Sequence, residues 1–311
     1  MYFSYLCTQN QTVNVRNDKK ARFLVCGNAR RNSQLGTAGE DRVHGSRHRS
    51  CGEGTAHQDT RGDGMIIKQE LSRKGILSDV ISLDDFFGGE ATPPLNTQGE
   101  PDFEAVEALD LKKMESCFAE FVKTGKTKMP IFDFINHQRS DAVKSIDLPS
   151  DGVLIVEGLH ALNPAVTNCL PQKNLYKIYA SVSTGLYDLE QGGERLLDSR
   201  DMRLIRRLSR DAHYRNSDAA NTLKMWDSVV DGEKKYITEF KKYADMRLST
   251  FHPYELCIFK KTVMNMLKHL PQDTPNYATA KRIEAVLKQI TNINTALVPE
   301  SSLLCEFIEK R

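Results

Sequence analysis

Short apolar runs alternate along the chain with longer stretches whose apolar residues recur at helical spacing. The runs cover residues 21–27, 80–83, 152–158 and 175–182, each with the length and composition of a buried parallel strand. Helical spacing covers 65–71, 107–124, 200–214 and 255–270. Strands that alternate with helices predict βαβ units around a parallel sheet, and therefore an α/β fold.

Residues 28–64 interrupt this pattern. Leu35 and Val43 are the only large aliphatic residues in the stretch, and it contains no aromatic residue. Because it has so little to bury, we predict that it is disordered. Its histidines and single cysteine lack a regular ligand spacing. Three interpretations stay open: a disordered insertion, a His/Cys metal site, or a segment foreign to the fold.

Composition narrows the class of protein. The 311 residues suffice for one large domain with appendages, and a net charge of +2 gives no argument for a nucleic acid or an acidic membrane as partner. The seven cysteines are odd in number and form no CxxC pair, which favours a reducing compartment. With no apparent signal peptide and no run of apolar residues long enough to span a membrane, we expect a cytoplasmic protein with small-molecule partners. A homo-oligomer stays open.

Two of the predicted strands end in acidic residues. Ser82-Leu83-Asp84-Asp85 follows one strand, and Val156-Glu157-Gly158 ends another. Ligands of parallel sheets bind beyond the carboxyl ends of the strands, where an acid can hold Mg²⁺ or accept a proton. Acids at strand ends are also ordinary turn and cap residues, so position alone does not decide their role.

The predicted helix over 200–214 carries a row of arginines. They are Arg200, Arg203, Arg207 and Arg210, at spacing i, i+3, i+7 and i+10. Planar guanidinium groups match phosphate oxygens, which makes this row a candidate phosphate clamp. The alternative is an exposed face paired with Asp198, Asp201 and Asp211, and the spacing favours neither.

Five blocks together resemble the uridine kinase/phosphoribulokinase family. Residues 82–87 and 102–110 are similar to its acceptor site, and 129–139 to its P-x-aromatic-D-F-x-x-H-x-R hairpin. Residues 153–160 are similar to its strand that ends in an acid, and 201–211 to its Arg-rich lid. The tail resembles longer nucleoside kinases that extend past the lid. The resemblance implies a P-loop-kinase-like three-layer domain with a parallel sheet and a lid helix over 21–260. A weakly ordered lead-in over 1–20 and a C-terminal helical extension over 261–311 would flank it.

The resemblance also implies residue roles. Asp84 would accept the proton of a nucleoside 5′-hydroxyl, Arg203 and Arg207 would clamp the phosphates, and Glu157 would hold Mg²⁺. The residues implied to line the nucleoside pocket are Phe103, Glu104, Phe132 and His137. Those implied to contact ATP are Gly27 and Arg210. Phe87 and Phe132 stand where uridine kinases usually have tyrosines, so selectivity for uridine is not implied.

The chain departs from the family at the phosphate loop. The family has G-x-x-x-x-G-K-[ST] after its first strand, but here Gly27 is followed by Asn-Ala-Arg-Arg-Asn. No lysine occurs between Lys20 and Lys68. The only Gly-Lys-Thr sequence, which begins at Gly125, has Glu120 in place of the upstream glycine. We interpret 28–64 as replaced sequence and expect weak or absent ATP binding.

These observations lead to one expectation and two alternatives. The expectation is an ATP- and Mg²⁺-dependent nucleoside kinase by descent, whose activity the altered loop lowers or abolishes. One alternative is a protein that binds a nucleoside without turning it over. The other is a kinase for a different small hydroxylated metabolite, such as a sugar phosphate.

Overall fold

The computed structural model describes residues 23–28, 63–89, 91–95, 99, 101–133, 136, 138–188, 192–214 and 217–309. Most of the stretch predicted to be disordered, residues 29–62, lies outside the described residues, and so does His137.

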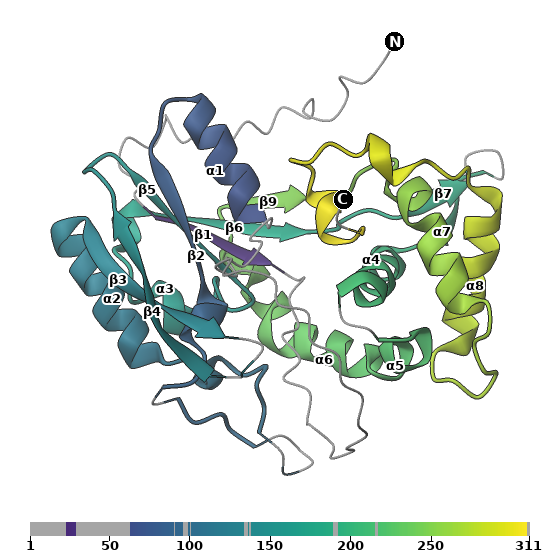
Figure 1. Ribbon diagram of the computed structural model, residues 1–311, viewed down its shortest axis with the longest axis horizontal. Coiled ribbons are helices and arrows are strands. Elements are labelled where there is room, and N and C mark those ends of the chain that lie inside the picture. The colour runs from purple at the N-terminus through teal and green to yellow at the C-terminus, as the bar shows by residue number, and fades with distance from the viewer. Residues whose placement is uncertain are drawn as a thin grey trace, which may run out of the picture.

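A five-stranded parallel sheet forms the centre of the fold (Figure 1), with strand order β2-β5-β1-β6-β9. The strands of the sheet are β1 (Phe23–Asn28), β2 (Ser78–Ser82), β5 (Val153–Gly158), β6 (Leu175–Ser181) and β9 (Met246–Ser249). β1 lies between β5 and β6, and helices pack against both of its faces. This explains why its sequence is apolar throughout rather than alternating.

Successive residues of β1 point to opposite layers of helices. Phe23 and Val25 pack in one hydrophobic cluster with residues of α2 (Leu111–Thr124), and the ring centroids of Phe23 and Phe121 are 5.6 Å apart. Leu24 and Cys26 pack in another cluster with residues of α1 (Asp63–Arg73). A helix layer on each side of the sheet gives the three-layer α/β architecture that the sequence predicted.

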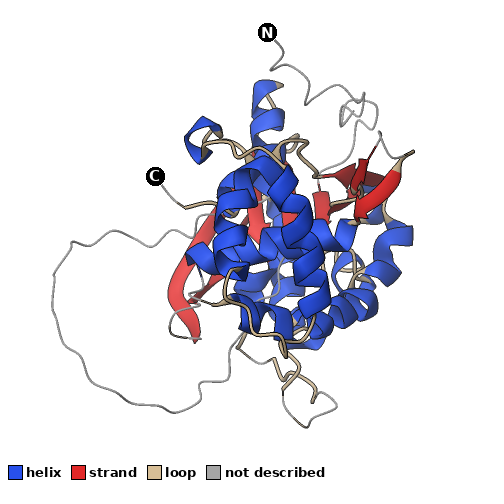
Figure 2. Cartoon of the chain, turned by 90° about the vertical axis from the view of Figure 1, so that its right-hand side faces the viewer, coloured by secondary structure: helices blue, strands red, loops and turns tan. Residues whose placement is uncertain are grey.

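A second body of helices packs beside the sheet (Figures 1 and 2). Its helices are α4 (Ser199–Tyr214), α5 (Ala219–Lys224), α6 (Trp226–Tyr236), α7 (Glu255–Leu267) and α8 (Tyr277–Gln289). One hydrophobic cluster runs through this body from Val182 to Ile308. α7 continues across residue 260, where the sequence analysis placed the end of the kinase-like part. The predicted extension therefore shares its core with the predicted lid helix.

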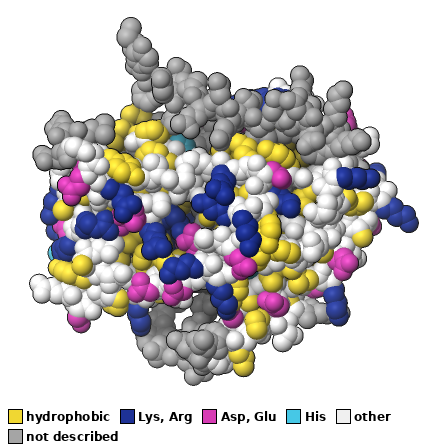
Figure 3. All heavy atoms as spheres, turned by 180° about the vertical axis from the view of Figure 1, so that it is seen from behind, with side chains coloured by type: hydrophobic (Ala, Val, Ile, Leu, Met, Phe, Trp, Pro, Cys, Tyr) yellow, Lys and Arg dark blue, Asp and Glu magenta, His cyan; other side chains and the backbone are white. Residues whose placement is uncertain are grey.

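Smaller elements complete the described chain. The hairpin of β3 (Lys126–Asp133) and β4 (Gln138–Asp147) is antiparallel, as is the pair β7 (Leu186–Asp188) and β8 (Glu194–Leu197); α3 spans Pro164–Thr167. Basic and acidic side chains intermingle over the coloured surface in Figure 3, in keeping with the net charge of +2. In the part of the chain that the structure describes, no helix has the length and hydrophobicity needed to cross a membrane.

The predicted helix over 107–124 starts later than its spacing indicated. A 3-10 turn occupies Val106–Ala108, and α2 begins only at Leu111. Asp110 causes the break, because its carboxylate accepts the backbone N–H of Lys113 at 3.0 Å and caps the helix. α2 ends at Thr124 and is capped by Gly125, whose φ of +74° suits glycine. The Gly-Lys-Thr sequence is thus a helix end that leads into β3.

Candidate active site

Asp84 and Glu157 lie at the same edge of the sheet. Ser82, the last residue of β2, pairs with Glu157 near the end of β5. Asp84 follows two residues later in a 3-10 turn, and its backbone N–H is bonded to the Ser82 hydroxyl at 3.4 Å. The exposed fractions of Asp84 and Glu157 are only 8% and 4%. Two acids that the sequence placed at strand ends therefore lie at the ends of adjacent strands, and both are buried.

The carboxylate of Glu157 also meets the start of α1. Its Oε2 accepts the backbone N–H of Gly64 at 3.2 Å. A negative charge is favourable there, because the first N–H groups of a helix have no partner within the helix. A Cβ on Gly64 would lie 2.8 Å from Oε2 of Glu157 and 2.8 Å from Cγ1 of Val80. The absence of a side chain at Gly64 is what lets the helix approach the acid so closely.

The carboxylate of Glu157 fits Mg²⁺. In proteins that bind nucleotides, Mg²⁺ is usually held by one or two carboxylates, with phosphates and waters as the remaining ligands. Glu157 offers one such carboxylate at the end of β5, with Asp84 on the adjacent strand end. Among the described residues no group of three or more His, Cys, Asp or Glu side chains could hold a metal by itself. A Mg²⁺ at this edge would therefore depend on substrate phosphates for part of its coordination.

The end of β1 lies beside these acids. Gly27 pairs with Gly158 of β5 on one side and with Tyr179 of β6 on the other. A Cβ on Gly27 would come within 2.6 Å of Cγ of Leu162, so the close packing of that leucine requires glycine. Its predicted contact with ATP stays a prediction. Lys68, the first lysine after the loop region, binds Asp79 near the opposite end of β2, with Nζ and Oδ1 3.0 Å apart.

The aromatic part of the predicted acceptor pocket comes together next to Asp84. Phe132, on β3, is buried, and its ring centroid is 5.9 Å from that of Phe87. Its backbone N–H donates to Oδ1 of Asp85 at 3.3 Å, which joins the hairpin to the turn that carries Asp84. Arg139 reinforces the same junction through Asp110, with Nη1 and Oδ2 3.0 Å apart. That arginine holds the pocket together from β4, a role that the sequence did not indicate.

Phe103 and Glu104 border the same region. Phe103 packs, partly buried, against the hydrophobic cluster on the α2 side of the sheet. The backbone N–H of Glu104 is bonded to Oδ1 of Asp102 at 3.1 Å, and its backbone also interacts with the imidazole of His160. Burial lowers the pKa of His160, although Asp84 and other nearby acids act in the opposite direction. A buried histidine, for which the sequence predicted no role, thus lies next to the backbone of Glu104 and close enough to Asp84 to feel its charge.

Of the lid arginines, Arg203 is the one that the described contacts connect with the strand ends. Its guanidinium pairs with Glu233 of α6. Burial raises the pKa of Tyr179, and both Glu233 and Arg203 act on that hydroxyl through their charges. Because Tyr179 is paired with Gly27 in the sheet, Arg203 lies on the β6 side of the candidate site.

Arg207 and Arg210 lie further along α4. Nε of Arg207 is 3.4 Å from Oδ2 of Asp211, so one of the ion pairs of the alternative interpretation is present. Arg210 is only partly buried. Asp198 instead caps α4, accepting the N–H of Arg200 at 2.8 Å. Whether Arg207 and Arg210 act on phosphates stays a prediction.

Arg206 lies outside the predicted row. Its side chain is buried and held by several hydrogen bonds. Its Nε donates to Oε1 of Glu255 at 3.0 Å, and its Nη2 donates to the carbonyl of Thr250 at 2.6 Å. The side chains of Arg206 and Glu255 are 3% and 0% exposed. This ion pair fastens α4 to α7, and no local spacing could have indicated it.

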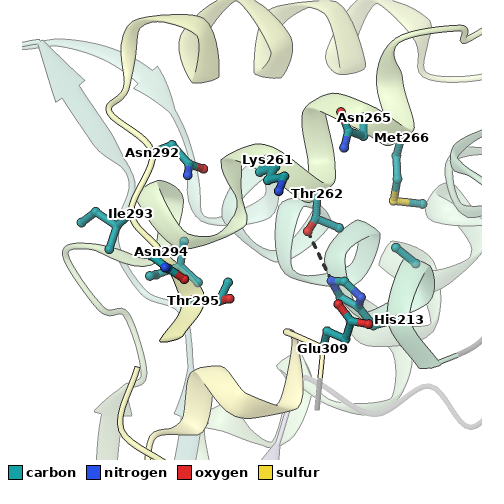
Figure 4. A pocket seen from close by; sticks show the side chains of 12 residues that line it. His213, Lys261, Thr262, Asn265, Met266, Asn292, Ile293, Asn294, Thr295 and Glu309 are labelled. Carbon is teal, nitrogen blue, oxygen red and sulfur yellow. Dashed lines mark hydrogen bonds between the residues drawn. The ribbon is translucent and has the colours of Figure 1, made fainter. Parts of the chain in front are cut away.

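A separate pocket of about 600 Å³ lies in the helical body (Figure 4). It is lined by the end of α4, one face of α7 and the chain around 292–295, and His213 is 3.2 Å from Thr262 across it. None of the residues proposed above for proton transfer, phosphate or acceptor binding lines it. The strand ends, and not this pocket, therefore define the candidate active site.

Comparison with known proteins decides the family. The model of the "Phosphoribulokinase / Uridine kinase family" matches residues 94–252, which is more than half of the chain. The chain belongs to this family. The match runs from the acceptor segment through the hairpin, β5 and the lid helix.

Curated relatives are uridine kinases by name. A chloroplastic uridine/cytidine kinase of Arabidopsis thaliana is 28% identical over 62% of this chain and 35% of its own length. A uridine kinase of Saccharomyces cerevisiae is 28% identical over 53% of this chain and 30% of its own. A uridine kinase of Staphylococcus aureus is 31% identical over 40% of this chain and 51% of its own length. The chain thus spans between about a third and a half of the relatives' lengths. Among solved structures, phosphoribulokinase from Rhodobacter spheroides is 16% identical, with a TM-score of 0.40 over 74% of this chain and 70% of that one.

Proposed function

We propose that the chain is a nucleoside kinase by descent, built to transfer the γ-phosphoryl group of ATP to a nucleoside 5′-hydroxyl. The observation that carries this proposal is the placement of Asp84 and Glu157 on adjacent strand ends, with Glu157 at the first turn of α1. The family membership and the names of the curated relatives support it.

In this proposal each residue has one task. Asp84 accepts the proton of the 5′-hydroxyl as its oxygen attacks phosphorus, which requires that the carboxylate be ionised and within hydrogen-bond reach. Mg²⁺, held in part by Glu157, offsets the negative charge of the phosphates when it is bound. Arg203, whose guanidinium pairs with Glu233 in this structure, would have to turn from that carboxylate to the transferred group to stabilise the charge that develops there. Phe87, Phe132 and Phe103 exclude water from the acceptor.

The acceptor side favours a nucleoside over a sugar phosphate. A phosphorylated acceptor needs an available lysine or arginine. The guanidinium of Arg139 is bonded to Asp110 and to two backbone carbonyls, so it is already committed. The rings of Phe87 and Phe132 instead offer the apolar surface that suits a base.

The second candidate is a protein that binds the nucleoside without turning it over. What favours it is the sequence after Gly27, which has no lysine before Lys68, together with the engagement of Lys68 by Asp79. A compact ammonium group at the phosphate loop is not replaced by the arginines of that stretch, because their planar charge is distributed differently.

Calorimetry with uridine, cytidine and Mg-ATP, each titrated separately into the full chain, tests both candidates. Transfer of label from γ-labelled ATP to the nucleoside would establish the kinase. Binding of nucleoside without Mg-ATP binding would show that the chain as it stands binds its acceptor without turning it over, which leaves descent from a kinase intact. The absence of binding by any nucleoside would overturn both.

A further inference from the structure

The last turn of α6 contacts two parts of the candidate site at once. Glu233 and Tyr236 are three residues apart on this helix, so their side chains project to the same side. Glu233 pairs with Arg203 of the lid helix. The hydroxyl of Tyr236 donates a hydrogen bond to Oδ2 of Asp102 at 2.6 Å. One helical turn therefore holds a residue on the phosphate side and a residue on the acceptor side.

Asp102 shapes the segment that carries two predicted pocket residues. Its Oδ1 accepts the N–H of Glu104 at 3.1 Å, and its carbonyl accepts the N–H of Ala105 at 3.2 Å. These bonds form a tight turn that fixes where Phe103 and Glu104 point. Since Tyr236 occupies the other carboxylate oxygen, it limits the rotation of the side chain on which the turn depends.

Tyr236 also packs against His160. Their ring centroids are 5.9 Å apart with an interplanar angle of 78°, an edge-to-face arrangement. His160 is 4% exposed and interacts with the backbone of Glu104. The tyrosine thus supports the turn in two ways, by its hydroxyl through Asp102 and by its ring through His160.

We propose that Tyr236 is a positioning residue, which holds the acceptor segment 101–104 in place over the carboxyl ends of β2 and β5. It does not touch the reacting atoms; it acts through Asp102 and His160. Its contribution to acceptor binding rests on the proposed function, whereas its effect on the order of the segment does not. Because Glu233 lies on the same turn, the acceptor segment and Arg203 share one support.

The test compares two variants that lose the same atom. Tyr236→Phe keeps the ring against His160 and removes the hydroxyl. Tyr243→Phe is the matched control, because Tyr243 is 46% exposed and its ring stacks on Phe240, a contact that phenylalanine keeps. Amide hydrogen exchange over 101–109 reports directly on the order of the acceptor segment.

We expect exchange of the amides of Glu104 and Ala105 to accelerate by about tenfold in Tyr236→Phe, the scale of losing one hydrogen bond to a charged acceptor. Tyr243→Phe should exchange like the parent. Fluorescence of Trp226, the single tryptophan, monitors the other end of α6 and should stay unchanged in both variants. Unchanged exchange in Tyr236→Phe, with Trp226 unchanged, would overturn the proposal.

A double-variant cycle with Asp102→Ala tests whether the two side chains act as one unit. We expect the acceleration in the double variant to be smaller than the product of the two single effects, because without the carboxylate the hydroxyl of Tyr236 has no contact left to lose there. Strictly multiplicative effects would overturn the link. A functional arm then measures nucleoside affinity, which should weaken in Tyr236→Phe and not in Tyr243→Phe. If the parent binds no nucleoside while the exchange result holds, the proposed function fails and the positioning role stands.

Discussion

The backbone N–H of Gly64 donates to Oε2 of Glu157 across 93 positions of sequence, at 3.2 Å. This contact joins the first turn of α1 to the end of β5 at the edge where Asp84 also lies. Because the carboxylate fits only against a residue without a side chain, the geometry of the candidate metal site depends on a single glycine.

Gly64→Ala should therefore destabilise the protein despite the better helix propensity of alanine. The added methyl group would lie 2.8 Å from both Glu157 and Val80, and overpacking of this kind costs about 1–3 kcal/mol. Gly232→Ala is the matched control in the interior of α6, since its added methyl group meets nothing within 4 Å. There we expect a gain of about 0.5–1 kcal/mol. Urea unfolding measures both, and equal free energies of unfolding for the two variants would contradict the argument.

The buried ion pair of Arg206 and Glu255 gives the second prediction. Arg206→Met leaves the carboxylate of Glu255 in a site with 0% exposure, which should cost about 3–5 kcal/mol in the free energy of unfolding. The double variant Arg206→Met, Glu255→Leu should recover part of that loss, because it leaves no lone buried charge. Lys126→Ala, which breaks an exposed pair with Asp147, is the control and should have little effect. A double variant as unstable as the single one would show that two hydrogen bonds, from Arg206 to the carbonyl of Thr250 and from the backbone N–H of His252 to Glu255, dominate over the charge.

The sequence predicts those parts of the fold that depend on interactions between residues close together in the chain. Asp84 and Glu157 could be placed together because each follows a recognisable apolar strand, and parallel strands end at the same edge. The edge strand β9 was not predicted, since a run of only four residues, one of them an arginine, does not stand out from the polar sequence around it. Its place in the sheet depends on pairing with β6, which has no local signal.

The lid shows the same limit. The spacing of the arginines predicts that Arg203 and Arg207 lie on one row of α4, but it does not predict their partners. Arg203 pairs with Glu233, 30 residues away, and Arg207 pairs with Asp211, one turn away. Arg206 pairs with a residue 49 positions on, and Tyr236 with one 134 positions back. Side-chain pairs so distant in sequence leave no periodic trace.

His160 gives a prediction about pH. Burial lowers the pKa of His160 in the folded protein, so the unfolded chain binds a proton at this residue more readily than the folded chain does. The free energy of unfolding should fall as the pH drops below about 6.5, the ordinary value for histidine, by up to about 1.4 kcal/mol per pH unit. Above that pH the contribution is fully present. In His160→Gln this part of the slope should be missing, and urea unfolding at intervals between pH 5 and pH 8 would reveal it. Parallel curves for the parent and the variant would exclude His160 as the source.

The phosphate loop and the proposed base give the last prediction. As it stands, the chain should bind Mg-ATP weakly or not at all, because the stretch between Lys20 and Lys68 supplies no lysine. Replacing the residues after Gly27 with a glycine-rich loop that ends in Gly-Lys-Ser should restore ATP binding, since Gly27 of β1 already lies beside Gly158, next to Glu157. Calorimetry measures the binding, and transfer of label to the nucleoside measures turnover.

In the repaired protein Asp84→Asn should lower kcat by about 10²-fold or more, the scale of losing a positioned general base, while the affinity for Mg-ATP changes much less. An unchanged kcat would remove Asp84 from proton transfer, and a repaired loop that still failed to bind Mg-ATP would show that the defect lies beyond the missing lysine.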